Sequence, residues 1–141
     1  MGLGLKRAEL QKLAEAKLSD ASILFQNERW ANGYYLSGYS VELGLKACIA
    51  KQFVAEAIPE KAFVEKIHTH NFPALVGLAG LRAELFECEE ADKAFAANWA
   101  LVSQWSEASR YQNTDTMTAQ AFYVAIKDSD HGVFQWIKKY W

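Results

Sequence analysis

The sequence predicts an all-α fold, a single domain over residues 1–141 built as an up-and-down bundle of about five helices. Its length of 141 residues is that of one domain with its own core. Apolar residues make up 51 % of the chain, and only two prolines interrupt it. The apolar positions recur at steps of three and four residues, the period of a helix, and the sequence lacks the alternation typical of a strand.

The first two helices are predicted from long, uninterrupted patterns. Residues 5–25 place Leu10, Leu13 and Leu24 on one apolar stripe, with most charged residues off it. After turn residues at 27–33, residues 34–53 carry few charges before Glu42, which predicts a second, largely buried helix.

Three shorter helices are predicted in the second half of the chain. Pro73 opens a third helix with an apolar side of four leucines, Leu75, Leu78, Leu81 and Leu85. Three short polar residues are expected to cap it, Thr69, His70 and Asn71. A fourth helix is predicted from about residue 89 to residue 108, and a fifth from the capping residues 113–118 to the C-terminus.

Composition and charge argue against several classes of protein. Seventeen acidic and fifteen basic residues give a net charge of −2, which argues against a generally basic protein that coats nucleic acid. An anionic partner would have to bind at a local basic patch. The charge-free stretch of residues 94–106 is too short and too polar to span a bilayer, and the first residues lack an apolar signal core. We therefore expect a cytoplasmic protein without a membrane partner.

The cysteines and histidines do not predict a metal site or a cofactor. Cys48 and Cys88 stand alone, without the CxxC spacing of a zinc site or the number needed for a disulfide framework. His68, His70 and His131 likewise lack a metal-ligand spacing, although Asp128 and His131 form an Asp-x-x-His pair if that segment is helical.

The second helix carries two unusual stripes. One consists of small residues at steps of four and three, Gly33, Ser37, Ser40, Gly44 and Ala47. Such a face allows a close helix crossing within the chain, or a two-fold interface between two copies, and we predict a homodimer. The other stripe is aromatic and polar, with Tyr35, Tyr39, Glu42 and Lys46. Glu42 and Lys46 have the spacing of an ion pair, which is either a solvated edge pair or part of a groove that binds anions or bases.

A third group of residues precedes the predicted fifth helix. Arg110 and Tyr111 follow Trp105 at the end of the predicted fourth helix. An arginine there suits the negative helix end, but it also lies beside the next helix start, where free N–H groups and a guanidinium can hold a phosphate.

Three segments together resemble the HEPN domain family: residues 30–47 (WANGYYLSGYSVELGLKA), 69–72 (THNF) and 109–111 (SRY). The resemblance implies a bundle of about five helices that dimerises side by side. It also implies a place in prokaryotic toxin–antitoxin, nucleotidyltransferase-associated or defence systems, or a nucleotide-binding role like that of the domain at the C-terminus of sacsin.

Many family members are metal-independent ribonucleases with an Arg, a polar residue and a His five to seven positions after the Arg. None of the four arginines, Arg7, Arg29, Arg82 and Arg110, is followed by a histidine at that spacing. The resemblance therefore implies the non-catalytic branch, which binds a nucleotide or an RNA phosphate without cutting it. The candidate ligand-binding residues are Arg110, Tyr111, Trp105, Lys46, Glu42, Tyr35, Tyr39 and His70.

Two alternatives remain open. The chain can serve as a protein-interaction module, for example the partner of a minimal nucleotidyltransferase. It can also retain ribonuclease activity if His70 or His131 is brought in from elsewhere in the fold or from a second subunit.

Overall fold

The computed structural model describes residues 4–141, except for the side chain of Arg110. Within this part the chain forms eight α-helices and one 3-10 helix, and no strand. The elements in order are α1 (Arg7–Gln26), α2 (Trp30–Ala50), α3 (Lys61–Lys66), α4 (Phe72–Leu78), α5 (Arg82–Ala91), α6 (Lys93–Val102), η1 (Glu107–Tyr111), α7 (Thr116–Lys127) and α8 (Val133–Lys138). The predicted all-α helical bundle is confirmed at this level.

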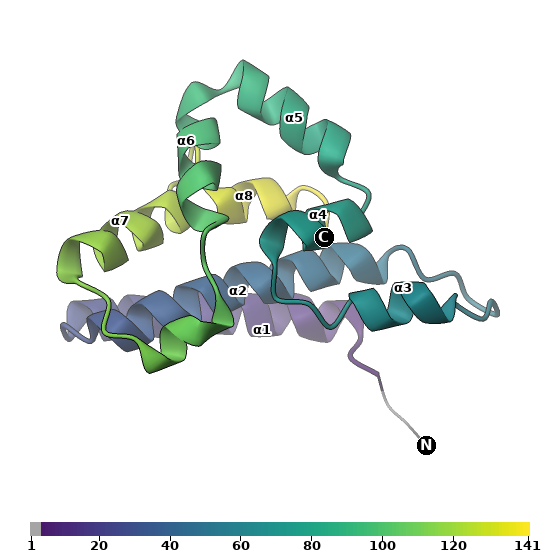
Figure 1. Cartoon of the computed structure of the whole chain (residues 1–141), viewed down its shortest axis with the longest axis horizontal. Coiled ribbons are helices and arrows are strands. Elements are labelled where there is room, and N and C mark those ends of the chain that lie inside the picture. Colours follow the sequence, from purple (N-terminus) through teal and green to yellow (C-terminus); the bar gives the residue numbers. More distant parts are fainter. Residues whose placement is uncertain (1–3) are drawn as a thin grey trace.

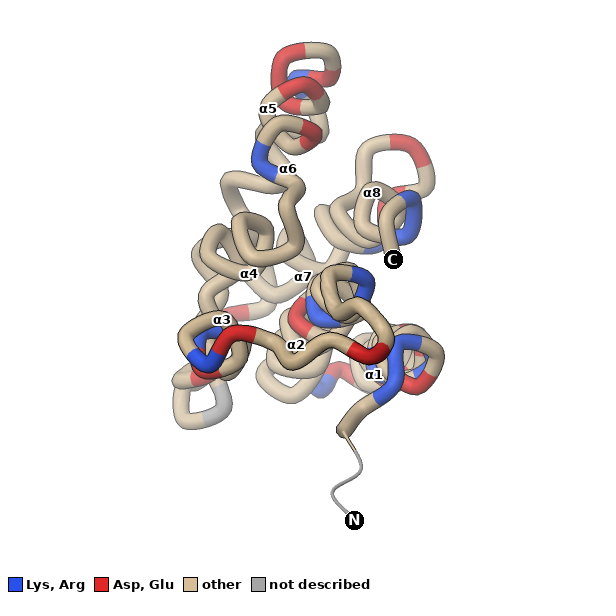
Figure 2. Tube along the Cα trace, turned by 90° about the vertical axis from the view of Figure 1, so that its right-hand side faces the viewer, with Lys and Arg blue, Asp and Glu red and all other residues tan. Residues whose placement is uncertain are grey.

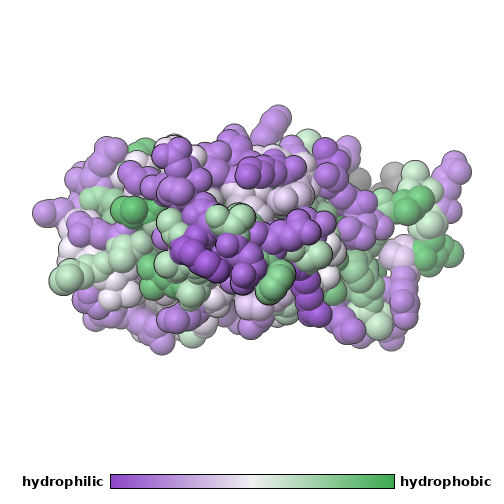
Figure 3. All heavy atoms as spheres, turned by 90° about the horizontal axis from the view of Figure 1, so that it is seen from above, coloured by the Kyte–Doolittle hydropathy of each residue, from purple (hydrophilic) through white to green (hydrophobic). Residues whose placement is uncertain are grey.

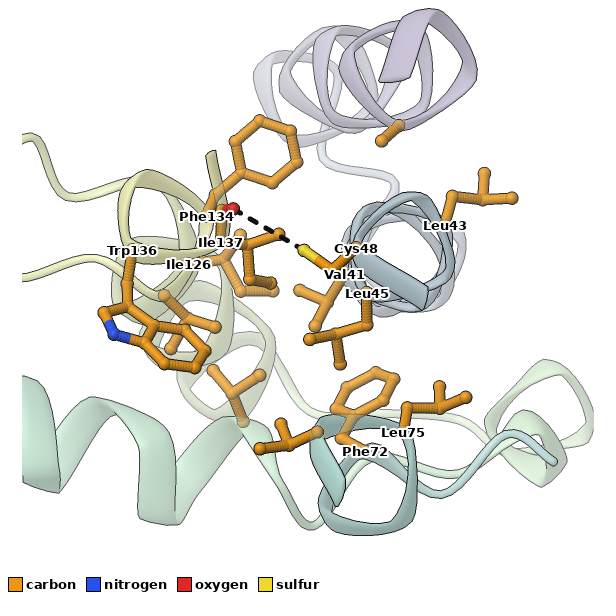
Figure 4. Packing of buried hydrophobic residues seen from close by; sticks show 14 of the residues in the cluster. Val41, Leu43, Leu45, Cys48, Phe72, Leu75, Ile126, Phe134, Trp136 and Ile137 are labelled. Carbon is orange, nitrogen blue, oxygen red and sulfur yellow. Dashed lines mark hydrogen bonds between the residues drawn. The ribbon is translucent and has the colours of Figure 1, made fainter. Parts of the chain in front are cut away.

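Helix α2 is the centre of the molecule. It forms a long hairpin with α1, and α7 and α8 cross it on one side while α4 and η1 pack on another (Figure 1). Helices α5 and α6 stand away from the hairpin (Figure 1). Val41, Leu45 and Ile49 of α2 are at most 1 % exposed and pack with buried residues of α4, α7 and α8 (Figure 4). The two long helices and the burial of the second were thus predictable from apolar spacing.

The number of helices differs from the prediction because short polar and glycine breaks divide the later segments. The third predicted helix ends at Leu78, since Gly80 adopts φ of +74°, and Leu81 and Leu85 belong to the start of α5 and its cap. Asp92 is extended and caps α6 by accepting from the N–H of Phe95, which interrupts the predicted fourth helix. That helix ends at Val102, before residue 108.

The predicted fifth helix is divided into α7 and α8. Asp128 leaves the helix, and its Oδ1 accepts hydrogen bonds from the N–H groups of Asp130 and His131 at 2.9 and 2.7 Å. The expected helical Asp-x-x-His pair is therefore wrong, because Asp128 contacts the backbone of His131 in a turn. The short helix α3 lies between the second and third predicted helices, where the sequence predicts no helix.

The small stripe of α2 is buried within the single chain. A Cβ at Gly33 would lie 2.8 Å from the ring of Phe25 on α1, and one at Gly44 would lie 3.1 Å from Ile137 on α8. All five residues of the stripe are buried, Gly33, Ser37, Ser40, Gly44 and Ala47. This overturns the assignment of these residues to a two-fold interface, because the chain's own helices occupy the space. The homodimer stays a prediction and needs another surface.

The surface has two regions of distinct character. Acidic residues gather on α5 (Figure 2). Apolar residues gather at the end formed by the α2–α3 connection, where Val54 and Ile58 are 71 % and 98 % exposed (Figure 3). Among the described residues, no helix combines the length and the apolar character needed to cross a membrane.

Candidate functional site

Three elements meet at the candidate site: α2, the segment that precedes α4, and η1. The segment before α4 is held by a local turn, in which Asn71 Oδ1 accepts from the N–H of Ala74 at 2.8 Å and Thr69 Oγ1 accepts from the N–H of Asn71 at 3.2 Å. Asn71 is the predicted cap of α4, but His70 does not cap it. The side chain of His70 points toward α2 instead.

A buried carboxylate holds the His70 imidazole. Glu42 Oε1 lies 2.6 Å from Nδ1 of His70, and Glu42 Oε2 accepts a hydrogen bond from Nζ of Lys46 at 3.2 Å. The predicted pair of Glu42 and Lys46 is confirmed, but it is not a solvated edge pair, since the Glu42 side chain is only 3 % exposed. A carboxylate at this depth needs such partners to offset the loss of its hydration.

A second carboxylate approaches the other ring nitrogen. Oε2 of Glu107, the first residue of η1, lies 2.9 Å from Nε2 of His70. The His70 and Glu107 side chains are both half-exposed, at 38 % and 48 %. We refer to Glu42, Lys46, His70 and Glu107 as the Glu42 cluster.

A shallow pocket opens beside the cluster. Its volume is about 280 Å³, and its lining residues are Thr69, His70, Asn71, Trp105, Ser106 and Glu107. The two carboxylates face opposite nitrogens of one ring and do not converge on a common point. Within the described residues, no group of three or more acidic, His or Cys side chains is arranged to hold a metal ion. The arrangement suits a ligand that forms a hydrogen bond with the outer nitrogen of the imidazole.

An aromatic row borders the cluster. Tyr35 stacks on Tyr39 with ring centroids 6.1 Å apart, and Trp105 lies 5.9 Å from Tyr35 and is stacked on Phe72 at 5.2 Å. Burial raises the pKa of Tyr39, and the charge of Glu42 adds to this. The two tyrosines are half-buried, but Trp105 is 3 % exposed. Trp105 therefore supports the wall of the pocket and does not offer a free face for stacking.

Trp105 is packed so tightly that α2 requires a glycine opposite it. A Cβ at Gly38 would overlap the indole ring around Nε1. This Nε1 has no hydrogen-bond partner within the described part of the chain. The sequence analysis did not single out Gly38, because a glycine between two stripes carries no signal of its own.

The remaining candidates lie at η1 and the start of α7. The side chain of Arg110 lies outside the described residues, and Tyr111 of η1 is 80 % exposed. The start of α7 already holds a carboxylate, because Asp115 accepts from the N–H and the hydroxyl of Thr118 at 2.9 and 2.7 Å. The hydrogen bond from this N–H contributes most to lowering the pKa of Asp115. The N–H groups predicted to receive a phosphate are thus partly occupied by the chain itself.

His131 belongs to a different pair. Its Nδ1 lies 2.7 Å from Asp92 Oδ2, which joins the α7–α8 turn to the start of α6. That hydrogen bond raises the pKa of His131 and lowers the pKa of Asp92. Of the two histidines considered for catalysis, only His70 is therefore part of the Glu42 cluster.

Six of the eight predicted ligand-binding residues contribute side chains to this region. They are Tyr35, Tyr39, Glu42, Lys46, His70 and Trp105. Glu107 was not predictable from the sequence, since an acidic residue ahead of Ser-Arg-Tyr has no spacing that relates it to His70. Comparison with protein-family models, with curated proteins and with solved structures found no significant match to the chain.

Proposed function

We propose that the chain is a HEPN-like domain that binds the phosphate of a nucleotide or of RNA at the Glu42 cluster, without cleaving it, and that it acts as a homodimer. The observation that carries the proposal is the His70 imidazole, which a buried carboxylate orients so that Nε2 faces a pocket. The family resemblance of the three segments supplies the class of ligand.

The donors of the cluster suit an oxyanion. In its doubly protonated form the His70 ring donates from Nδ1 to Glu42 and can donate from Nε2 to a phosphate oxygen. Lys46 uses one of its three ammonium protons for Glu42, and its side chain is 18 % exposed. Tyr35 and Tyr39 lie beside these donors and offer partly exposed rings to a base.

Thermal unfolding with a panel of nucleotides and a short RNA, in EDTA, tests the proposal. A ligand at about a hundred times its Kd stabilises the native state by about 2.7 kcal/mol, which raises Tm by several degrees. We expect this rise in the wild type and in His68→Ala, whose imidazole is exposed, and a smaller rise in His70→Ala. If no nucleotide and no RNA shifts Tm, phosphate binding is refuted and the interaction module becomes the better reading.

The homodimer is tested separately, by the molecular mass in solution. Light scattering should give twice the mass of the chain, which is 15.9 kDa. A monomer at micromolar concentration would refute this part of the proposal while leaving phosphate binding intact.

RNA cleavage is the second candidate, and the pair of Glu42 and His70 favours it. A histidine whose one nitrogen is held by a carboxylate is the usual arrangement of a general base, which here would take the proton of a 2′-hydroxyl at Nε2. The same incubation in EDTA, followed by gel analysis of the RNA, decides between the two. Fragments in the wild type and in His68→Ala, and intact RNA in His70→Ala, would establish cleavage.

A further inference from the structure

The outer nitrogen of His70 is already occupied by an anion. Glu107 Oε2 lies 2.9 Å from Nε2, the position at which a phosphate oxygen would have to bind. Glu107 also lines the pocket beside the imidazole. A ligand therefore meets a carboxylate at the only edge of the ring that Glu42 leaves open.

We propose that Glu107 is a built-in competitor for the phosphate site, which an incoming phosphate must displace from His70. This inference rests on the proposed function and assigns a regulatory role to a residue that the family resemblance does not include. Glu107 occupies the site in the free protein and lowers the affinity for every anionic ligand by the same factor.

The geometry allows Glu107 to leave without unfolding the site. Its side chain is 48 % exposed, so a rotamer change takes the carboxylate into water. Trp105, two residues before it, is stacked on Phe72 and buried, which anchors the chain at the base of η1. The Ser106 hydroxyl accepts from the N–H of Ala108 at 3.0 Å, so the backbone turn does not depend on Glu107.

The carboxylate of Asp115, which caps the start of α7, is held more firmly than that of Glu107. Asp115 accepts two hydrogen bonds, from the N–H and the hydroxyl of Thr118. Glu107 makes its close approach to one nitrogen of a half-exposed ring. Exposed ion pairs of this kind are weak, and a ligand can exchange with them readily. Of the two, Glu107 is the carboxylate that a phosphate can replace.

Glu107→Gln tests the proposal, with Glu87→Gln on α5 as the control for the change in net charge. Glu87 is an exposed residue of α5, the helix on which acidic residues gather (Figure 2). Kd is measured by calorimetry for two probes that differ in net charge, adenosine 5′-monophosphate and adenosine 5′-triphosphate. Loss of the competitor should tighten binding about fivefold, which corresponds to about 1 kcal/mol, the upper end for an exposed pair.

Two features of the result distinguish competition from general repulsion. Competition affects every ligand equally, so the gain should be the same for both probes, whereas repulsion grows with the charge of the ligand. The gain should also disappear in the His70→Ala background, because Glu107 then has no ring nitrogen to occupy. Glu87→Gln should leave both Kd values unchanged.

Each other outcome has a defined meaning. If the wild type binds the probes and Glu107→Gln binds them equally well, the competitor is refuted and the phosphate site stands. A gain that Glu87→Gln matches, or that persists without His70, is an effect of net charge and also refutes it. If neither the wild type nor Glu107→Gln binds either probe, the proposed function and this inference both fail.

Discussion

Removing the imidazole of His70 should destabilise the fold, although the residue is half-exposed. His70→Ala takes from Glu42 the shorter of its two polar contacts, 2.6 Å against 3.2 Å to Lys46. A hydrogen bond to a charged group contributes about 1.5–3 kcal/mol net, and water can replace part of it at a ring that is 38 % exposed. We expect a loss of about 2 kcal/mol, which lowers Tm by about 4–8 °C for a chain of this size.

The assay is thermal and urea unfolding of the wild type and four variants. His68→Ala is the matched control, because its imidazole is exposed, and it should change stability by less than about 0.5 kcal/mol. Glu42→Gln alone and combined with His70→Ala completes a double-mutant cycle. The imidazole stabilises the fold less once the charge of Glu42 is removed. The double variant should therefore lose about 1 kcal/mol less free energy of unfolding than the sum of the two single variants. A His70→Ala loss no larger than that of His68→Ala, or strict additivity in the cycle, would refute the reasoning.

Three further predictions concern packing, pH and reactivity. Gly38→Ala should lower stability by about 2 kcal/mol or more, measured by urea unfolding, since the new methyl overlaps the Trp105 indole. The pKa of His131 is raised above 6.5 by its hydrogen bond to Asp92, so the bond's stabilisation should be fully present below pH 6.5 and be lost as pH rises through the folded pKa. A comparison of Tm between the wild type and His131→Gln across this range checks the sign. Burial raises the pKa of the Cys48 thiol to about 11, so a thiol reagent should modify it in the native protein only at the rate of unfolding.

The long helices with a continuous apolar spacing were predictable from the sequence. The points at which a single residue divides a predicted helix into two were not. Helices α1 and α2 follow from long apolar patterns. The helical spacing of apolar residues also continues through Gly80, Asp92 and Asp128, where the backbone leaves the helix. Apolar spacing alone does not show where the chain changes direction. Gly80 and Asp92 are capping types, but such residues also occur inside helices.

Most side chains of the candidate site were predictable one by one, but Glu107 and the contacts within the site were not. The ion pair of Glu42 and Lys46 is local, and its spacing alone predicts it. The contact of Glu42 with His70 joins residues 28 positions apart, and it depends on how α4 packs against α2. The approach of Glu107 to His70 depends in addition on the course of the chain after α6. Burial of Glu42 likewise results from this packing, which the stripe of Tyr35, Tyr39, Glu42 and Lys46 does not reveal.

The buried charge of Glu42 works against an anion, so any phosphate must be held by donors that point away from it. Replacing a buried ion pair with apolar residues is often neutral for stability. We therefore infer that the main role of the Glu42 carboxylate is to orient His70 and Lys46. Lys46→Gln removes the ammonium donor of the cluster and should weaken binding of adenosine 5′-monophosphate about five- to tenfold, the equivalent of one charge-assisted hydrogen bond.

Lys46→Arg is the matched control, because it keeps the charge and the reach to Glu42. It should retain most of the affinity, while both variants keep the fold, as circular dichroism and Tm can establish. Unchanged affinity in Lys46→Gln would place the phosphate away from α2, nearer to Arg110, whose part in binding stays a prediction from the sequence.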